Sequence, residues 1–176
     1  MADVCMGDPG ELQHSSWCTF EEVNETNIDE LERINQVIFP IKYPRRVYDD
    51  IVACGGVSQL ARLSDTSKRI VGGISCRLEN TVNGPILYII TLGVLSPYRS
   101  MGLGSMLLNR CLDMVQLCLP EVHVAKLHVQ VGNDDAIRFY EKHGFEIVER
   151  IENYYVRVEP RHAVVLQKSL MQPCNS

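Results

Sequence analysis

The chain has 176 residues, of which 45% are hydrophobic and 22% are charged, and its formal net charge is −5. This length and composition are typical of one globular domain with a core of ordinary size. The acidic balance argues against general nucleic-acid binding, and no stretch reaches the ~18 apolar residues that a transmembrane helix needs.

The cysteines and the chain ends bear on the compartment. The seven cysteines are scattered and include no Cys-x-x-Cys pair, so we expect free thiols, no metal site, and a reducing compartment that is cytoplasmic or also nuclear. Residues 1–16 lack the basic and apolar regions of a secretory signal. We expect disordered tails at 1–16 and 172–176, with one domain spanning 17–171.

Strands and helices are expected to alternate from the start of the domain. The patterns predict a strand at 18–23, a helix from an Asn27 cap to about Val37, and a short helix at 46–52. Glu30, three residues after Asn27, would complete a capping box. Strands follow near 57–63, 70–79 and 86–95. The strand at 86–95 is apolar on both faces, as a central buried strand should be.

The second half of the domain continues this alternation. A helix is expected at about 102–117, then a strand at 126–131, then a helix at 134–143 that Gly144 terminates. Strands at 145–149, 154–158 and 164–166 complete the chain. This order predicts an α/β (α+β) fold in which helices cover both sides of one mixed, mostly antiparallel sheet.

The junction between the strand at 86–95 and the next helix has the features of a phosphate site. Its Arg-x-x-Gly-x-Gly run consists of Arg99, Gly102 and Gly104. The first N–H groups of a helix lack intrahelical partners and lie at the positive end of its dipole, glycines leave that backbone accessible, and arginine adds a forked donor. The run is not a dinucleotide fingerprint, because Leu107 occupies the third glycine position, nor a P-loop, because no lysine follows Gly104.

This run resembles the acetyl-coenzyme-A-binding motif of the GNAT superfamily of acetyltransferases. Residues 133–145, with the pattern Asn-x-x-Ala-x-x-Phe-Tyr-x-x-x-Gly-Phe, are similar to the late cofactor motif of that family. The resemblance implies the GNAT fold with splayed central strands, acetyl-CoA as cofactor, and Tyr140 as the candidate acid for the leaving thiolate. The implied cofactor-binding residues are Leu92, Gly93, Val94, Arg99, Ser100, Gly102, Leu103, Gly104, Ser105, Asn133 and Tyr140.

Acyl transfer from a thioester to an amine needs a group that takes the amine proton. Because free α-amines have pKa values of about 7.7–8.0, a weak base acting through water is sufficient. Many GNAT enzymes place a glutamate on the central strand, but no Asp or Glu lies between Pro85 and Ser96 here. The resemblance places the strand at 126–131 beside the central strand. We therefore predict Tyr88 and His128, on these neighbouring strands, as the catalytic pair.

Further segments resemble the family of NatE-type N-terminal acetyltransferase catalytic subunits. These segments are 35–43, with Phe-Pro-Ile-x-Tyr at its end, 87–93, 127–130 and 153–160. In that family two loops close over the first residues of a peptide. The substrate-binding residues implied here are Phe39, Pro40, Ile41, Tyr43, Ile90, Tyr154, Tyr155 and Val158. Tyr154 and Tyr155 are adjacent on an expected strand, so we expect them to point to opposite faces.

The resemblance thus implies an N-α-acetyltransferase that acetylates the free N-terminal amines of proteins, including nascent chains. Phe39, Pro40 and Ile41 form an apolar wall that suits an initiating methionine, followed by an apolar residue. The resemblance also implies contact with NatA complex subunits and the ribosome, and no membrane or specific nucleic-acid partner. Two alternatives stay open: acetylation of lysine side chains or small amines, and a non-catalytic scaffold subunit of an N-terminal acetyltransferase complex.

Overall fold

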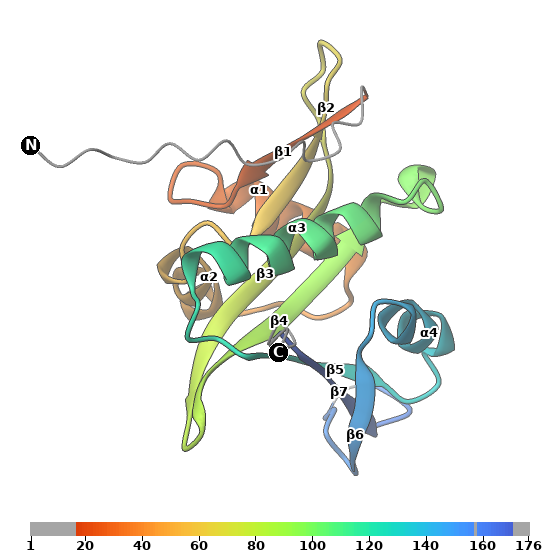
Figure 1. Ribbon diagram of the computed structural model, residues 1–176. Helices are drawn as coiled ribbons and strands as arrows, with labels where there is room; N and C mark the ends of the chain where they lie inside the picture. Colours follow the sequence, from red (N-terminus) through yellow and green to blue (C-terminus); the bar gives the residue numbers. More distant parts are fainter. Residues whose placement is uncertain (1–16, 157, 171–176) are drawn as a thin grey trace, which may run out of the picture.

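Seven strands form one sheet in the order β1-β2-β3-β4-β5-β7-β6 (Figure 1). The computed structural model describes residues 17–156 and 158–170, so both expected tails lie outside the described residues. The elements are β1 (Cys18–Glu22), α1 (Ile28–Ile38), α2 (Arg45–Ala53), β2 (Gln59–Leu63), β3 (Ile70–Thr81), β4 (Gly84–Val94), η1 (Ser96–Tyr98), α3 (Leu103–Cys118), β5 (Val124–Gln130), α4 (Asp134–Lys142), β6 (Glu146–Ile151) and β7 (Ala163–Ser169).

The sheet is mixed and mostly antiparallel, as predicted, because β4 and β5 are its one parallel pair among the described strands. Two adjacent glycines of β3 show that helices cover both faces. A Cβ atom at Gly72 would lie 3.3 Å from Leu107 of α3, whereas one at Gly73 would lie 3.1 Å from Leu31 of α1. In Figure 1, α3 crosses the front of the sheet, with α1 and α2 behind it. Among the described helices, none combines the length and the hydrophobicity needed to cross a bilayer.

A β-bulge in β4 changes which face its side chains occupy. Ser75 of β3 pairs with Thr91, and the next residue, Cys76, pairs with Ile89, so Ile90 is an extra residue in β4. An extra residue reverses the alternation of side chains beyond it. Leu87 and Ile89, before the bulge, therefore belong to the core beneath α3.

Beyond the bulge, the odd-numbered residues of β4 face α1 instead. Thr91 donates a hydrogen bond to Asn35 of α1, and a Cβ atom at Gly93 would lie 3.0 Å from Phe39, directly after α1. Ile90 packs against the cluster between α1, α2 and β2. The bulge therefore places Ile90, Thr91 and Gly93 on one face of the sheet.

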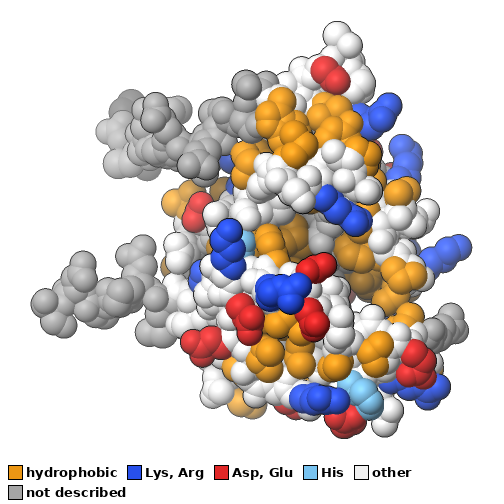
Figure 2. Space-filling model, turned by 90° about the vertical axis from the view of Figure 1, so that its right-hand side faces the viewer, with side chains coloured by type: hydrophobic (Ala, Val, Ile, Leu, Met, Phe, Trp, Pro, Cys, Tyr) orange, Lys and Arg blue, Asp and Glu red, His pale blue; other side chains and the backbone are white. Residues whose placement is uncertain are grey.

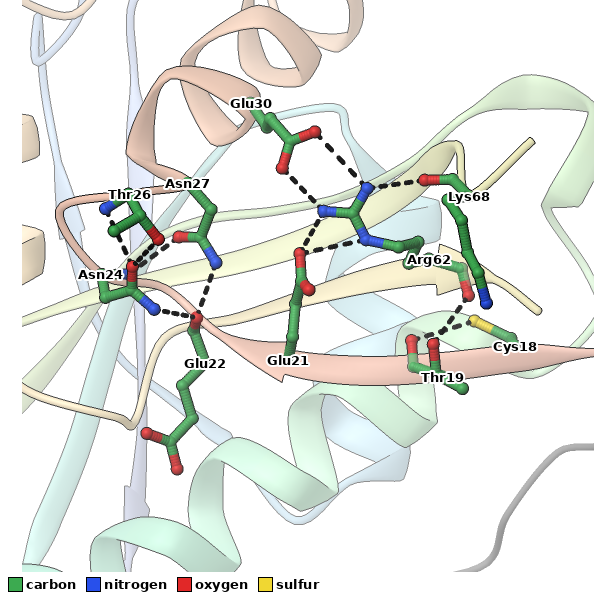
Figure 3. Close-up of polar contacts among 10 residues, drawn as sticks. All are labelled: Cys18, Thr19, Glu21, Glu22, Asn24, Thr26, Asn27, Glu30, Arg62 and Lys68. Carbon is green, nitrogen blue, oxygen red and sulfur yellow. Dashed lines mark hydrogen bonds and ion pairs between the residues drawn. The ribbon is translucent and has the colours of Figure 1, made fainter. Parts of the chain in front are cut away.

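The predicted capping box at the start of α1 is wrong, although Asn27 does precede the helix. Asn27 Oδ1 accepts a hydrogen bond from Asn24 N at 2.8 Å, and its Nδ2 donates to Glu22 O at 2.9 Å (Figure 3). Glu30 pairs with Arg62 and not with the helix start. Local side-chain bonds to the turn compete with capping for the same atoms, and here the turn between β1 and α1 takes them.

The predicted strand at 154–158 is also wrong for residues 154–156 and 158, whereas residue 157 lies outside the described residues. After β6 ends at Ile151, the described residues up to β7 form an irregular loop. Asn153 has φ of +54°, a left-handed conformation that ends extended structure. Tyr155 N donates to Arg161 O at 2.8 Å, which closes the loop upon itself and provides no strand pairing.

Arg62 of β2 connects three separate segments (Figure 3). Its guanidinium donates to Glu21 of β1, to Glu30 of α1 at 2.7 Å, and to the carbonyl of Lys68 in the β2–β3 turn at 2.6 Å. Its side chain is 19% exposed. The two carboxylates would repel each other without the cation between them.

Replacing Arg62 with methionine should lower the free energy of unfolding by about 1–2 kcal/mol, between the value of a shielded charged hydrogen bond and that of an exposed ion pair. Urea unfolding measures this change. Arg45→Met is the matched control, because the Arg45 side chain is 60% exposed in its ion pairs with Asp29 and Asp49. We expect that variant to lose less than about 0.5 kcal/mol, and equal losses would contradict the central role of Arg62.

Candidate active site

The strands β4 and β5 diverge soon after they meet. They pair at Leu87 with Ala125 and at Tyr88 with Lys126, and at no further described position. Beyond this point β4 stays paired with β3, and β5 stays paired with β7. The splay that the resemblance implied is therefore present, and it leaves the backbone of β4 at 89–94 without a strand partner on its β5 side.

The predicted catalytic residues touch each other where the strands begin to diverge. The Tyr88 hydroxyl lies 2.8 Å from His128 Nδ1. His128 is two residues beyond Lys126, the partner of Tyr88, so the two side chains share a face. The imidazole also stacks on Tyr154, with ring centroids 4.4 Å apart and planes within 8°.

Burial keeps both members of this pair neutral. Desolvation lowers the pKa of His128 below its usual 6.5, and the nearby Lys126 ammonium lowers it further. Desolvation also raises the pKa of Tyr88, and the neighbouring Tyr154 hydroxyl adds to this effect. At neutral pH the imidazole therefore keeps one unprotonated nitrogen while the phenol keeps its proton, so the pair can accept and pass on a proton.

A buried hydrogen-bond chain fixes the last turn of α1 to the sheet beside this pair. Ser75 and Thr91 hydroxyls lie 2.5 Å apart, and Thr91 donates to Asn35 Oδ1 at 3.3 Å. Asn35 is 3% exposed, and its backbone carbonyl accepts from Phe39 N. Sequence reasoning missed this residue, although an asparagine on the apolar face of a helix is a visible signal.

Phe39 lies against the backbone of β4. A Cβ atom at Gly93 would lie 3.0 Å from the Phe39 ring and 2.9 Å from Ile38. Such contacts are too close for a real side chain, so the glycine lets the end of α1 approach the strand. Gly93, predicted as a cofactor residue, therefore also positions the predicted substrate residue Phe39.

The two predicted substrate loops come together around one pocket of about 490 Å³. The lining residues are Pro40, Ile41, Lys42, Tyr154, Tyr155, Val156 and Val158. Tyr43, which follows this lining in the first loop, is half-buried, and burial raises its pKa to about 12, with the nearby Tyr155, Tyr48 and Tyr154 adding to the shift. Tyr154 and Tyr155 do not point to opposite faces as expected: their rings are in edge contact, with centroids 4.9 Å apart. The irregular loop, in place of a strand, permits this contact.

The loop between β6 and β7 that carries Tyr154 and Tyr155 (the tyrosine loop) is held in place by Gln130 of β5 and by His162, which precedes β7. Gln130, on the same face as His128, donates from Nε2 to Pro160 O at 2.8 Å. His162, just before β7, places its ring nitrogen Nδ1 against the Glu152 carboxylate at the start of the loop. The loop is thus attached to the strand that carries His128.

The predicted anion site has the expected backbone geometry. Ser100 and Gly102 have φ of +62° and +81°, and a Cβ atom at Gly102 would meet no atom within 4 Å. The hydrogen-bonded turns of α3 begin with Met106 N to Gly102 O, so the N–H groups of residues 103–105 lack intrahelical acceptors. Arg99 donates from Nε to Val94 O at 2.9 Å and is otherwise exposed. Figure 2 presents this side of the molecule, where hydrophobic side chains surround a recess.

The late cofactor residues occupy α4, beside the start of α3. Asn133, which directly precedes α4, caps this helix because its Oδ1 accepts a hydrogen bond from Ala136 N. The predicted contact with the cofactor would involve the same side chain. Tyr140 is 7% exposed and packs edge-on against Phe139 and Phe145. Burial raises its pKa, so it keeps its proton.

The comparisons with known proteins agree with this geometry. Residues 24–145 match the acetyltransferase (GNAT) family. The chain is 44% identical to N-alpha-acetyltransferase 50 of Danio rerio over 153 residues, which are 87% of this chain and 89% of that protein. It is 42% identical to the Drosophila melanogaster protein named probable N-acetyltransferase san, covering 85% of this chain and 79% of that one.

A solved structure extends these likenesses to three dimensions. Arabidopsis thaliana Naa50 in complex with the bisubstrate analogue CoA-Ac-MVNAL is 42% identical to this chain and has a TM-score of 0.78. The match covers 86% of this chain and 98% of the Arabidopsis chain.

Replacing Lys126 with glutamine should raise the pKa of His128, because it removes a positive charge that disfavours the imidazolium. A histidine NMR titration measures the shift. Lys68→Gln, in the distant β2–β3 turn (Figure 1), is the control and should leave the titration unchanged. A fall in the pKa of His128 in the Lys126 variant would contradict the electrostatic assignment.

Proposed function

Because the chain belongs to the acetyltransferase (GNAT) family, we propose that it is an N-α-acetyltransferase, which transfers acetyl from acetyl-CoA to the free N-terminal amine of proteins. The relatives named for this activity are 42–44% identical over most of the chain. The observation that carries the proposal is the contact between Tyr88 and His128 where β4 and β5 diverge. It puts a neutral base beside the pocket that the two loops form.

The residues present fit acetyl-CoA. The first N–H groups of α3, the open surface over Gly102 and the Arg99 guanidinium suit the pyrophosphate. The backbone of Leu92, Gly93 and Val94 has no strand partner on the β5 side, and it suits amide groups that need hydrogen-bond partners. When bound, acetyl-CoA supplies the acetyl group as a thioester.

Three side chains of this protein handle the protons. His128, which is neutral, can accept the proton that the amine must lose. Tyr88, which keeps its own proton, can relay it by donating its hydroxyl proton to His128 Nδ1 while it takes one from the amine. Tyr140, protonated because it is buried, is the donor for the sulfur. A weak base is adequate, since the α-amine is already partly deprotonated at neutral pH.

The acceptor we propose is a protein that begins with methionine followed by an apolar residue. Pro40, Ile41 and Val158 give the pocket an apolar wall, and an unbranched thioether fits irregular apolar surfaces. Tyr43, Tyr154 and Tyr155 have hydroxyls that suit the peptide backbone. The analogue bound by the Arabidopsis relative, CoA-Ac-MVNAL, also begins with methionine.

The enclosure of the pocket favours a chain end over a lysine side chain. Side chains from both loops line the one pocket, and a lysine in mid-chain would have to pass its flanking backbone between the loops. A scaffold role is less favoured, because a purely structural subunit has no need for the contact between Tyr88 and His128.

We further propose that the protein acts on nascent chains in the cytoplasm, and also in the nucleus, in contact with NatA subunits and the ribosome. The support is the family likeness, together with the free thiols of the described cysteines, which suit a reducing compartment. Co-sedimentation with ribosomes from cell extracts tests this association.

A peptide assay tests the main proposal. We expect Met-Leu peptides to be acetylated at the α-amine with a higher kcat/KM than peptides with polar first residues. The difference should be about ten- to a hundred-fold, since one apolar pocket discriminates by roughly 1–3 kcal/mol. Mass spectrometry locates the acetyl group. If a peptide with a blocked N-terminus and an internal lysine is the better acceptor, the protein is a lysine acetyltransferase and the proposed N-terminal activity is wrong.

Substitution of the central pair tests the mechanism. Tyr88→Phe and His128→Ala should each lower kcat by about 10²–10⁴-fold, with less than additive effects in the double variant. Because the pKa of His128 is lowered, kcat of the unaltered enzyme should fall on acidification only below pH 6.5, the ordinary histidine value. His123→Ala, an exposed position before β5, should keep full activity. Full activity in the double variant would remove both residues from the mechanism.

A further inference from the structure

The acceptor pocket has one charged lining residue among those described. Lys42 follows Ile41 in the loop between α1 and α2, and the other lining side chains are aliphatic, aromatic or proline. Lys42 is exposed, as are Pro40 and Val156, whereas Tyr155 and Val158 are half-buried. The ammonium therefore lies on the solvent-exposed side of the pocket, and the two less exposed lining residues, Tyr155 and Val158, carry no charge.

The described residues leave this charge without a counter-ion. Lys42 is in no ion pair among the described residues, while three carboxylates of the adjoining segments, those of Asp29, Glu32 and Glu159, have other partners. Asp29 and Glu32 of α1 pair with Arg45. On the tyrosine loop, Glu159 pairs with Arg161. An uncompensated cation beside a pocket is available to a ligand.

We propose that Lys42 makes the enzyme select acidic residues just beyond the first two positions of its acceptor. This inference rests on the proposed N-terminal acetyltransferase function. The first residues fill the apolar part of the pocket, and the following chain, extending about 3.3 Å per residue, leaves past the rim. There the ammonium attracts Asp or Glu and repels Arg or Lys.

The charge of the whole protein predicts the opposite preference. A net charge of −5 favours basic peptides in solution. The charge of Lys42 and the net charge of the protein therefore favour peptides of opposite charge. A measured preference for acidic peptides identifies Lys42 as its source. Because Lys42 is exposed, the preference should be modest, about two- to five-fold, and should decline as salt is added.

Peptides that differ only at positions three and four provide the test. Each begins with Met-Leu and continues with Asp-Glu, Ser-Ser or Arg-Arg. Arginine is used in place of lysine so that the α-amine is the single amine in every peptide. The measurement is kcat/KM at low and at high ionic strength, with the acetylated position confirmed by mass spectrometry.

Three variants assign the effect to its residue. The unaltered enzyme should prefer the Asp-Glu peptide over the Arg-Arg peptide, Lys42→Gln should lose this preference, and Lys42→Glu should reverse it. Lys68→Glu makes the same change of net charge in the β2–β3 turn, and it should keep the original preference.

The outcomes separate the inference from the function on which it rests. If the unaltered enzyme acetylates the Ser-Ser peptide but treats the Asp-Glu and Arg-Arg peptides equally, the role of Lys42 is overturned and the function stands. A preference that Lys42→Glu leaves unchanged also overturns it. If no peptide is acetylated at its α-amine, the function and the inference are overturned together.

Discussion

The divergence of β4 from β5 is the constraint on which the rest of the site depends. Two parallel strands that pair at only two positions leave backbone donors and acceptors of β4 without a strand partner, and buried groups of this kind need one. The same divergence opens the sheet beside Tyr88 and His128. One departure from regular pairing thus creates both a stretch of unpaired backbone, which suits a ligand that carries amide groups, and an opening beside Tyr88 and His128. A fully paired sheet would provide neither.

The bulge at Ile90 determines how the two loops meet this opening. Without the extra residue, Thr91 and Gly93 would face α3. The end of α1 would then lose the hydrogen bond between Asn35 and Thr91 and the packing of Phe39 against Gly93. With the extra residue, Asn35 binds Thr91, and Phe39 rests on Gly93. The predicted substrate loop that follows α1 is therefore positioned by the strand that carries Tyr88. The tyrosine loop is positioned by Gln130, on the strand that carries His128. Tyr88 thus shares β4 with the residues that hold the loop after α1, and His128 shares β5 with Gln130, which holds the tyrosine loop.

The parts of the fold that the sequence predicts are those that local chemistry decides. Gly144, with φ of +79°, ends α4 because glycine readily adopts that conformation. The alternation of β5 places His128 opposite Leu127. The failures have non-local causes. Glu30 is taken from the capping box by Arg62, which lies 32 residues away in the chain, and the bulge at Ile90 results from pairing with β3 that no single-strand pattern shows.

The tyrosine loop shows the same limit at the site itself. A run such as Tyr154-Tyr155-Val156 has the composition of a strand, but it lies in the connection between β6 and β7, and because these strands pair antiparallel the chain has to reverse its direction there. The loop folds upon itself, and both tyrosine rings can then turn toward the same pocket. Aromatic residues that in a strand would divide between two faces here form one wall. The loss of regular structure is therefore what allows this segment to form a wall of the pocket, and it could be found only once the sheet order was known.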